Sequence, residues 1–167
     1  MTIYRPEAPA DAPAIERLLD RAFGPNRQAK ASYGFRRGIA PRGELSRVAV
    51  DAAGSVVGTI RYWPIRVGEA PALLLGPVGV TPELQGQGIG RRLIHDTLQL
   101  AAAGGARAVF LVGDPAYYRP LGFLAAGDLA SMPNEDPTRL HGLPLGSTTT
   151  LPRGVLRPAA LRLPAAS

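Results

Sequence analysis

The sequence predicts an α/β protein of the α+β type, with a mixed, mostly antiparallel central sheet flanked by helices. Apolar, β-branched runs joined by short turns occupy the first half of the chain, a glycine-rich turn then opens an amphipathic helix, and a short buried strand follows it. With 167 residues, 46% of them hydrophobic, the chain has the size of one domain. We expect a single domain over residues 1–167, with 125–167 extending the sheet at its C-terminal end.

The first elements are a short strand and a helix. Ile3 to Arg5 predicts the strand, and Asp11 is expected to cap the helix, which ends at Gly24-Pro25. Its apolar stripe consists of Ile15, Leu18, Leu19 and Ala22. Gln28 to Arg37 is weakly helical at best, so we treat residues 24–42 as a mobile connection that covers a site.

An antiparallel meander is expected next. Glu44 to Asp51 and Val56 to Trp63 are strand-like runs, and Asp51-Ala52-Ala53-Gly54 between them has the composition of a hairpin turn. Val67-Gly68-Glu69-Ala70 marks a second turn, into the long apolar run that ends at Val80.

The pattern then changes to a helix and a further strand. Helical spacing relates Ile89, Leu93, Ile94, Thr97, Leu98 and Ala101. Gly104-Gly105 ends this helix, and Ala108 to Val112 reads as a buried strand. A strand, helix, strand unit favours a right-handed crossover and a parallel pair, which makes the sheet mixed. Pro115 to Pro120 predicts a helical turn, and the tail predicts strands at Leu140 to Leu145 and near Val155.

Charge limits the choice of partner. The net charge of +6 favours anionic partners such as phosphorylated cofactors, acidic surfaces or nucleic acid. The pairs Arg36-Arg37 and Arg91-Arg92 are too short for a nucleic-acid stripe, and no aromatic residues interleave them. We therefore expect no nucleic-acid partner.

Composition also limits the chemistry and the location. Without cysteine there are no disulfides, zinc-thiolate sites or thiol nucleophiles, and two histidines give little material for a metal site, so we expect no metal. The run from Ala70 to Val80 contains two prolines and two glycines and is too short to cross a bilayer. Residues 1–14 lack the features of a secretory signal. We expect a cytoplasmic monomer or homodimer with no membrane partner.

The segment from Gln85 to Gly90 carries the functional signal, because it places three glycines, spaced by two, at a helix start. Free backbone N–H groups and the helix dipole favour an anion there, and glycines let phosphate oxygens approach the backbone. Arg91 and Arg92 add formal charge at the mouth. This pattern predicts a pyrophosphate site.

Other interpretations of the same glycines compete. A nucleoside triphosphate loop needs Gly-Lys followed by Ser or Thr, which is absent here. A dinucleotide fingerprint needs G-x-G-x-x-G directly after a strand, whereas this chain has G-x-G-x-G five residues beyond Val80; Asp114 nevertheless stands where an acid would contact a ribose. Dinucleotide binding therefore remains an alternative, as does a purely structural turn.

Two motifs resemble the GNAT superfamily of acyl-CoA N-acyltransferases. Gln85-Gly86-Gln87-Gly88-Ile89-Gly90 matches its Q/R-x-x-G-x-G/A signature, and Tyr118 followed by Gly122-Phe123 resembles its tyrosine, three residues, Gly-Phe pattern. The order of elements agrees from Ile3 to Phe123, and Gly113 to Tyr118 resembles a subgroup of bacterial predicted acetyltransferases.

The resemblance implies a GNAT-like fold and direct attack of a primary amine on the thioester of acetyl-CoA, without a covalent enzyme intermediate. The implied acceptor is a small-molecule or peptide amine. Backbone groups of Val78, Gly79 and Val80 would bind the pantetheine arm and the thioester carbonyl. The pyrophosphate would be bound by Gln85, Gly86, Gln87, Gly88, Ile89, Gly90 and Arg91.

Tyr118 matches the family's general acid, which protonates the departing thiolate; a phenol with an ordinary pKa near 10 keeps its proton at neutral pH. Tyr117 is the adjacent alternative, which we interpret as core or pocket wall. Some relatives carry a glutamate before the glycine loop, but this chain has no acid from Ala70 to Thr81. We assign the general base to none of the remaining candidates, Glu69, His95 and His141.

Three functions stay open at this point: an acetyl-CoA-dependent N-acetyltransferase, a non-catalytic module that binds acyl-CoA or a nucleotide, and a nicotinamide dinucleotide enzyme. The segments expected to line the acceptor pocket, Phe23 to Arg42 and the tail after Phe123, carry no diagnostic motif. The sequence alone does not identify the acceptor.

Overall fold

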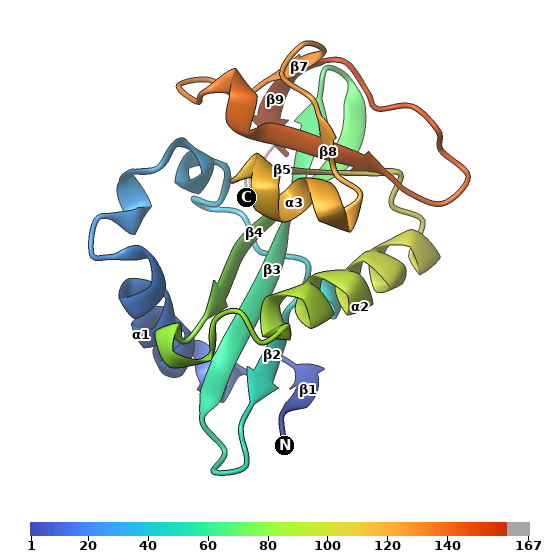
Figure 1. Cartoon of the computed structure of the whole chain (residues 1–167). Coiled ribbons are helices and arrows are strands. Elements are labelled where there is room, and N and C mark those ends of the chain that lie inside the picture. The colour runs from blue at the N-terminus through green and yellow to red at the C-terminus, as the bar shows by residue number, and fades with distance from the viewer. Residues whose placement is uncertain (160–167) are drawn as a thin grey trace, which may run out of the picture.

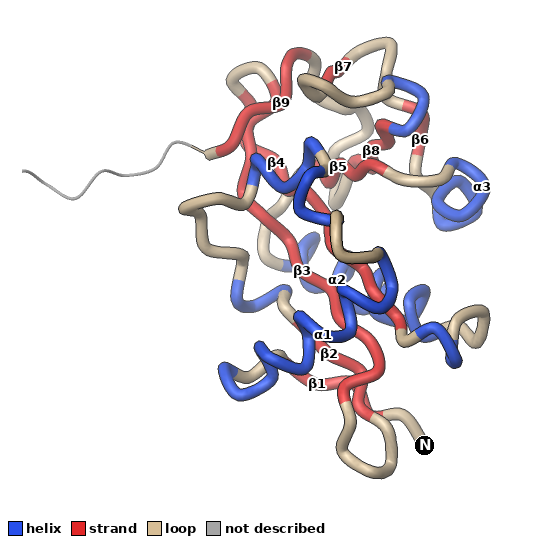
Figure 2. Tube along the Cα trace, turned by 90° about the vertical axis from the view of Figure 1, so that its left-hand side faces the viewer, coloured by secondary structure: helices blue, strands red, loops and turns tan. Residues whose placement is uncertain are grey.

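A computed structural model describes residues 1–159, in which nine strands form one mixed sheet (Figures 1 and 2). Its main path runs β1-β2-β3-β4-β5-β8-β6, and β9 pairs with both β3 and β7. The strands are β1 (Ile3–Pro6), β2 (Arg47–Val50), β3 (Val56–Val67), β4 (Ala70–Val80), β5 (Ala108–Val112), β6 (Leu124–Ala125), β7 (Ala130–Ser131), β8 (Leu140–Pro144) and β9 (Gly154–Pro158). The helices are α1 (Ala12–Phe23), α2 (Ile89–Ala103) and α3 (Pro115–Tyr118).

The predicted meander and crossover are both present. β1 to β4 pair antiparallel in sequence order, and β4 and β5 then pair parallel across α2. The predicted fold class, a mixed and mostly antiparallel sheet flanked by helices, is therefore confirmed.

α1 and α2 cover opposite faces of the sheet. Alternate residues of a strand point to opposite faces, and in β2 Val48 and Val50 pack against α1, whereas Ala49 packs in the cluster that contains α2. Gly58 lets α2 approach closely, since a Cβ there would lie 2.9 Å from Cγ2 of Ile89.

Two expectations for the first 50 residues need correction, the Asp11 cap and the start of the second strand. Asp11 precedes α1, but its carboxylate does not cap that helix: it accepts from the backbone N–H of Ala8 at 2.7 Å and pairs with both terminal nitrogens of Arg5. Glu44 belongs to a 3-10 turn, so β2 begins at Arg47. Within residues 24–42, Arg27–Ala29 and Ala31–Phe35 form 3-10 turns, and the segment is attached to the body of the protein by buried Phe35 and by buried Arg27, which pairs with two carboxylates.

The C-terminal part adds strands to the same sheet. The predicted strands near residues 140–145 and 155 are present as β8 and β9, and the two-residue strands β6 and β7 are additional. Figures 1 and 2 both place these strands at the end of the molecule away from β1. Residues 160–167, part of the expected extension, lie outside the described residues.

Two further observations hold for residues 1–159. None of their helices has the length and apolarity needed to cross a membrane. No three of their histidine, aspartate or glutamate side chains gather in a way that could hold a metal ion.

Candidate active site

The sheet opens between β4 and β5. These strands pair only where Leu73 lies opposite Val109 and Leu74 opposite Phe110. Beyond this point β4 continues to Val80 along β3, and no described strand pairs with its other edge. The opening exposes a stretch of β4 backbone on the side of β5.

The hydrogen-bond alternation of an antiparallel pair identifies the backbone groups that face this opening. Thr81 donates its N–H to the carbonyl of Val57, so residues 57 and 81 form a hydrogen-bonded pair. Two residues back, Gly79 is again paired with β3, whereas the backbone groups of Val78 and Val80 point away from it. The free N–H of Val78 and the backbone groups of Val80 are thus directed toward the opening.

Gly79 has a different part in the structure. A Cβ at this position would lie 2.8 Å from Cδ2 of Leu19 and 2.9 Å from Cδ2 of Leu18, both in α1. Glycine therefore allows α1 to pack against β4. Its backbone belongs to the β3 ladder, so the structure separates it from the other two residues predicted with it.

The glycine-rich turn presents free N–H groups at the start of α2. Gly86 and Gly88 have φ of 83° and 90°, a left-handed conformation that favours glycine. Arg92 makes the first helical bond, to the carbonyl of Gly88 at 3.0 Å, so the amides of the first turn, from Ile89 to Arg91, have no helical partner. Such a turn is suited to binding an anion.

Gly90 lies close to Tyr117. A Cβ there would lie 2.8 Å from the hydroxyl oxygen of Tyr117, which reaches the first turn of α2 from α3. Gln85 steadies the other end of the turn, because its Nε2 donates to the carbonyl of Val80 at 3.1 Å. The turn therefore lies between β4 and α3.

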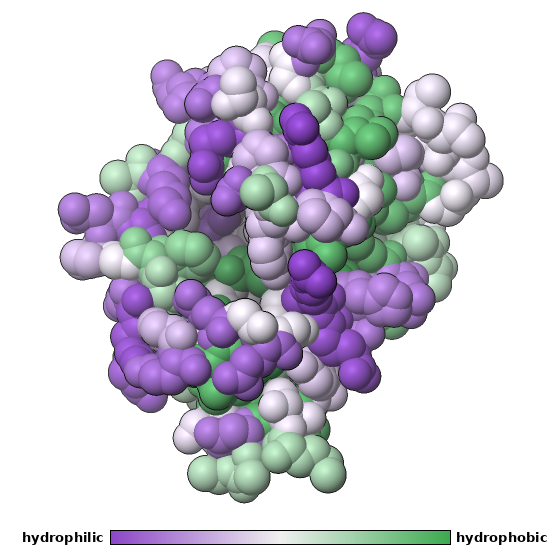
Figure 3. Space-filling view, in the orientation of Figure 1, coloured by the Kyte–Doolittle hydropathy of each residue, from purple (hydrophilic) through white to green (hydrophobic). Residues whose placement is uncertain are grey.

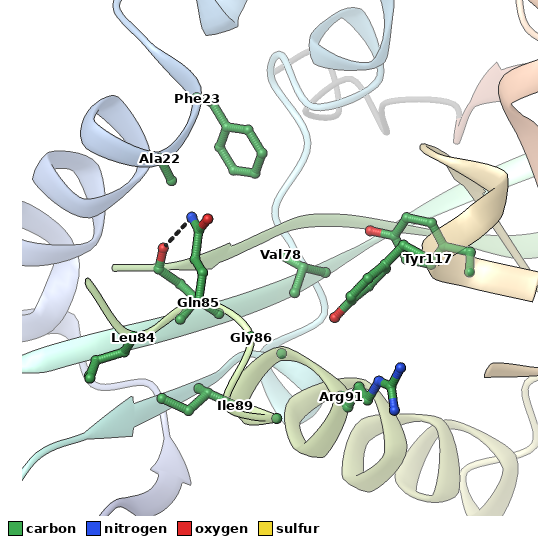
Figure 4. Close-up of a pocket in the computed structure, with 13 residues that line it drawn as sticks. Ala22, Phe23, Val78, Leu84, Gln85, Gly86, Ile89, Arg91 and Tyr117 are labelled. Atoms are coloured by element: carbon green, nitrogen blue, oxygen red, sulfur yellow. Dashed lines mark hydrogen bonds between the residues drawn. The ribbon is translucent and has the colours of Figure 1, made fainter. Parts of the chain in front are cut away.

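A cavity of about 740 Å³ lies along these elements. In Figure 4, Ala22 and Phe23 of α1 lie on one side of it and Ile89 and Arg91 of α2 on the other, with Val78 between them. Figure 3 shows this face hollowed near its centre, with apolar surface between polar groups. The lining residues are Ala22, Phe23, Val78, Val80, Leu84, Gln85, Gly86, Gly88, Ile89, Gly90, Arg91, Tyr117 and Tyr118.

This cavity brings together the predicted cofactor-binding residues except Gly79 and Gln87, and it includes Tyr118. Gln87 is exposed outside the lining. Ala22 and Leu84 were not predicted to line the site. The sequence placed Ala22 only in the apolar stripe of α1, and nothing in the sequence singled out Leu84.

Two charged residues considered in the sequence lie elsewhere. Arg92, expected at the mouth, instead pairs with Asp96 at 2.7 Å and lies over the ring of Tyr4. Asp114, the acid that a dinucleotide site would use, caps α3 by accepting the N–H of Ala116 at 2.9 Å, and it does not line the cavity. The position of Asp114 weakens the dinucleotide interpretation.

A second cavity, of about 270 Å³, adjoins the first, because Phe23, Val78 and Tyr118 line both. It lies in the opening between β4 and β5. Its other walls come from the two segments in which the sequence places the acceptor pocket, namely residues 30–36 and the tail, and its charged lining residues are Lys30, Arg36, Glu135 and Arg139.

Tyr118 stands where the two cavities meet. Its ring packs edge-on against Tyr117 and Phe123, with centroids 4.8 and 5.9 Å away. Burial raises the pKa of Tyr118 to about 12. The phenol is therefore protonated at neutral pH and able to donate.

None of the three unassigned base candidates lines either cavity. Glu69 pairs with Arg157 at the tip of a hairpin, and His95 is exposed on α2. His141 is fully buried, with Nδ1 2.8 Å from the carbonyl oxygen of Arg139. Glu135, which the sequence did not single out, is the one carboxylate among the described lining residues of the two cavities.

A mixed sheet that opens beside a glycine-rich helix start, with a tyrosine at the junction of two cavities, fits the N-acetyltransferase class of acyltransferases that the two motifs resemble. Comparison with known families agrees: the model of the Acetyltransferase (GNAT) family matches residues 12–123. The chain belongs to the GNAT family.

Individual relatives support this assignment. The chain is 35% identical over 124 residues to the uncharacterized N-acetyltransferase YhbS of Escherichia coli K12, covering 72% of each chain. It resembles the crystal structure of E. coli YhbS in complex with CoA, with a TM-score of 0.77 and 28% identity over 93% of this chain and 88% of that one. A GNAT acetyltransferase from Brucella melitensis, in complex with acetyl-CoA, gives a TM-score of 0.72 and 30% identity, covering 96% and 97%.

Proposed function

We propose that this protein transfers an acetyl group from acetyl-CoA to a primary amine by direct attack within a ternary complex. The observation that carries the proposal is the junction of the two cavities at Val78 and Tyr118. One cavity has the size and the anion-binding turn for the donor, and the other opens toward the acceptor. Two similar structures contain CoA and acetyl-CoA, which supports the choice of donor.

In this mechanism the amine nitrogen bonds to the thioester carbonyl carbon, the carbon–sulfur bond breaks, and the sulfur leaves as a thiolate. The outward N–H of Val78 would stabilise the carbonyl oxygen as it gains negative charge. Tyr118 would give its proton to the thiolate and regain one from solvent. The amides from Gly86 to Arg91 would hold the pyrophosphate, and water would accept the proton that the amine loses.

The donor is tested by thermal melting with equal concentrations of acetyl-CoA, CoA, NAD and ATP. A ligand that binds only the native state raises the melting temperature, so the first two should raise it and the last two should not. A shift with NAD alone would contradict the proposal.

Turnover is tested by release of free thiol from acetyl-CoA in the presence of an amine panel. The chain has no cysteine, so a thiol reagent detects only product. Acetyl-CoA binding without thiol release for any amine would instead support the alternative of a non-catalytic module.

A further inference from the structure

The second cavity is lined by a partly buried arginine, Arg36, that pairs with no acid among the described residues. Arg36 forms no ion pair within residues 1–159, and its buried Nε has no hydrogen-bond partner there. Its guanidinium stacks on the ring of Tyr33, 4.1 Å from the centroid, and one terminal nitrogen would lie 3.2 Å from a Cβ built on Gly76. The guanidinium therefore lies beside Gly76, in the β4 wall of the cavity.

Two other arginines of this region, in contrast, form ion pairs. Arg27 pairs with Asp20 and Glu16, and Arg61 pairs with Glu7 at 2.7 Å. Taking a cation partly out of water without an anionic partner is costly, and its positions over the rings of Tyr33 and Trp63 compensate only in part. Burial lowers the pKa of Arg36 to about 10, so the group is still charged at neutral pH.

The charged residues that line the cavity carry a net positive charge. Lys30 and Arg139 also line it, and Glu135 is the one described carboxylate. An amine acceptor arrives mostly as an ammonium ion. An alkylamine or a lysine-rich peptide would therefore meet net repulsion, whereas an acceptor that also carries an anion would be attracted.

We propose that the acceptor is a small amine bearing a carboxylate, bound through that carboxylate by Arg36. The inference rests on the proposed acetyl transfer. A planar guanidinium matches a carboxylate with two parallel hydrogen bonds, and a cavity of about 270 Å³ admits a molecule of amino-acid size. Lys30 and Arg139 add to the attraction, and Glu135 provides a counter-charge for the ammonium group before it loses its proton.

The test uses matched acceptor sets, each consisting of an α-amino acid, its carboxamide, its decarboxylated amine and its phosphonate analogue, together with a basic peptide. Thiol release from acetyl-CoA gives kcat/KM for each. The carboxylates should exceed the carboxamides and simple amines by roughly ten- to a hundredfold, the range for a hydrogen-bonded charge pair.

Arg36→Gln should bring the ratio of kcat/KM for the carboxylate to kcat/KM for the carboxamide close to one, mainly by raising the KM of the carboxylate acceptor. The KM of acetyl-CoA should not change. Arg37→Gln is the matched control, because Arg37 is exposed and lines neither cavity. If Arg36→Gln does not fold, the ratio of kcat/KM for carboxylate and carboxamide acceptors in the unmodified protein still tests whether the acceptor carries a carboxylate.

Preference for carboxamides, simple amines, phosphonates or the basic peptide would overturn the acceptor proposal while showing that the protein does transfer acetyl groups. Failure to bind acetyl-CoA, or binding without turnover of any acceptor, would refute the proposed function itself, which keeps the two failures distinct.

Discussion

Replacing Tyr118 with phenylalanine removes one hydroxyl and leaves the ring in place. The ring fills the space beside Gly113, where a Cβ would lie 2.3 Å from Cε2 of the tyrosine, and it contacts Phe123. Because these contacts persist, the variant should remain folded. Its effect on turnover then reports on the proton alone.

General acid catalysis contributes roughly a hundred- to ten-thousandfold, which corresponds to about 3 to 5 kcal/mol of the activation free energy. We therefore expect Tyr118→Phe to lower kcat by that factor and to change the affinity for acetyl-CoA by less than about threefold. Thiol release gives kcat, and calorimetric titration of acetyl-CoA gives the affinity.

The pH dependence provides a second measurement. An ordinary phenol would lose activity as an acid near pH 10. Burial disfavours the charged phenolate and raises the pKa of Tyr118 to about 12, so its protonated form persists to higher pH. The activity of the unmodified protein should thus show no decline due to this group up to about pH 10 to 11. A decline centred well below pH 10 that Tyr118→Phe abolishes would show that this reasoning about burial is wrong.

Tyr117→Phe is the matched control. The hydroxyl of Tyr117 lies at the first turn of α2, beside Gly90, rather than at the junction of the cavities. We expect kcat to change by less than about threefold. If Tyr117→Phe abolishes turnover and Tyr118→Phe does not, the acid is Tyr117; if neither matters, the assignment of the general acid to Tyr118 is wrong.

Three further predictions concern the loop, the core and acid stability. Gly88→Asp should weaken acetyl-CoA binding by much more than tenfold in calorimetric titration, because a carboxylate would face the pyrophosphate. Strain at the positive φ should also cost about 1–2 kcal/mol of stability, which melting measures. An unchanged affinity would place the phosphates elsewhere. Gly58→Val should destabilise the fold by about 1–3 kcal/mol in urea unfolding, because its side chain would collide with Ile89, and an unchanged midpoint would contradict this packing. Arg5 lowers the pKa of Asp11 to about 2, so the stability that the ionised carboxylate contributes is complete above pH 4 and lost toward pH 2. Asp11→Asn should therefore be less stable than the unmodified protein at pH 7. Between pH 4 and pH 2 the variant should lose less stability than the unmodified protein does.

The predictions that agree with the structure rest on local chemistry. β-branched runs separated by turn residues identified the meander, and the helical spacing after the glycines identified α2 and the parallel crossover. Gly86 and Gly88 do adopt positive φ, which is the property that made the turn recognisable.

The features that the sequence did not predict depend on long-range contacts. The carboxylate of Asp11 accepts hydrogen bonds from Arg5 and Ala8. The local N-cap pattern therefore predicted the helix correctly, but not the partners of this carboxylate. Glu135 reaches the second cavity from a tail without periodicity, and nothing in its neighbourhood indicates that β4 and Arg36 lie opposite it. Residues about 100 positions apart in the chain form that cavity, and only the folded sheet brings them together.

The alternation along the β4 edge gives three consecutive amides unequal freedom to exchange with solvent deuterium. Gly79 is already bonded to β3, whereas the N–H groups of Val78 and Val80 face the opening. Acetyl-CoA bound along this edge would act as an additional strand made from another molecule. It would protect the amides of residues 78 and 80 from exchange and leave the exchange of the residue 79 amide almost unchanged. Residue 79 would then serve as an internal reference in the same peptide, and the contrast with its neighbours would report occupancy without any chemical turnover.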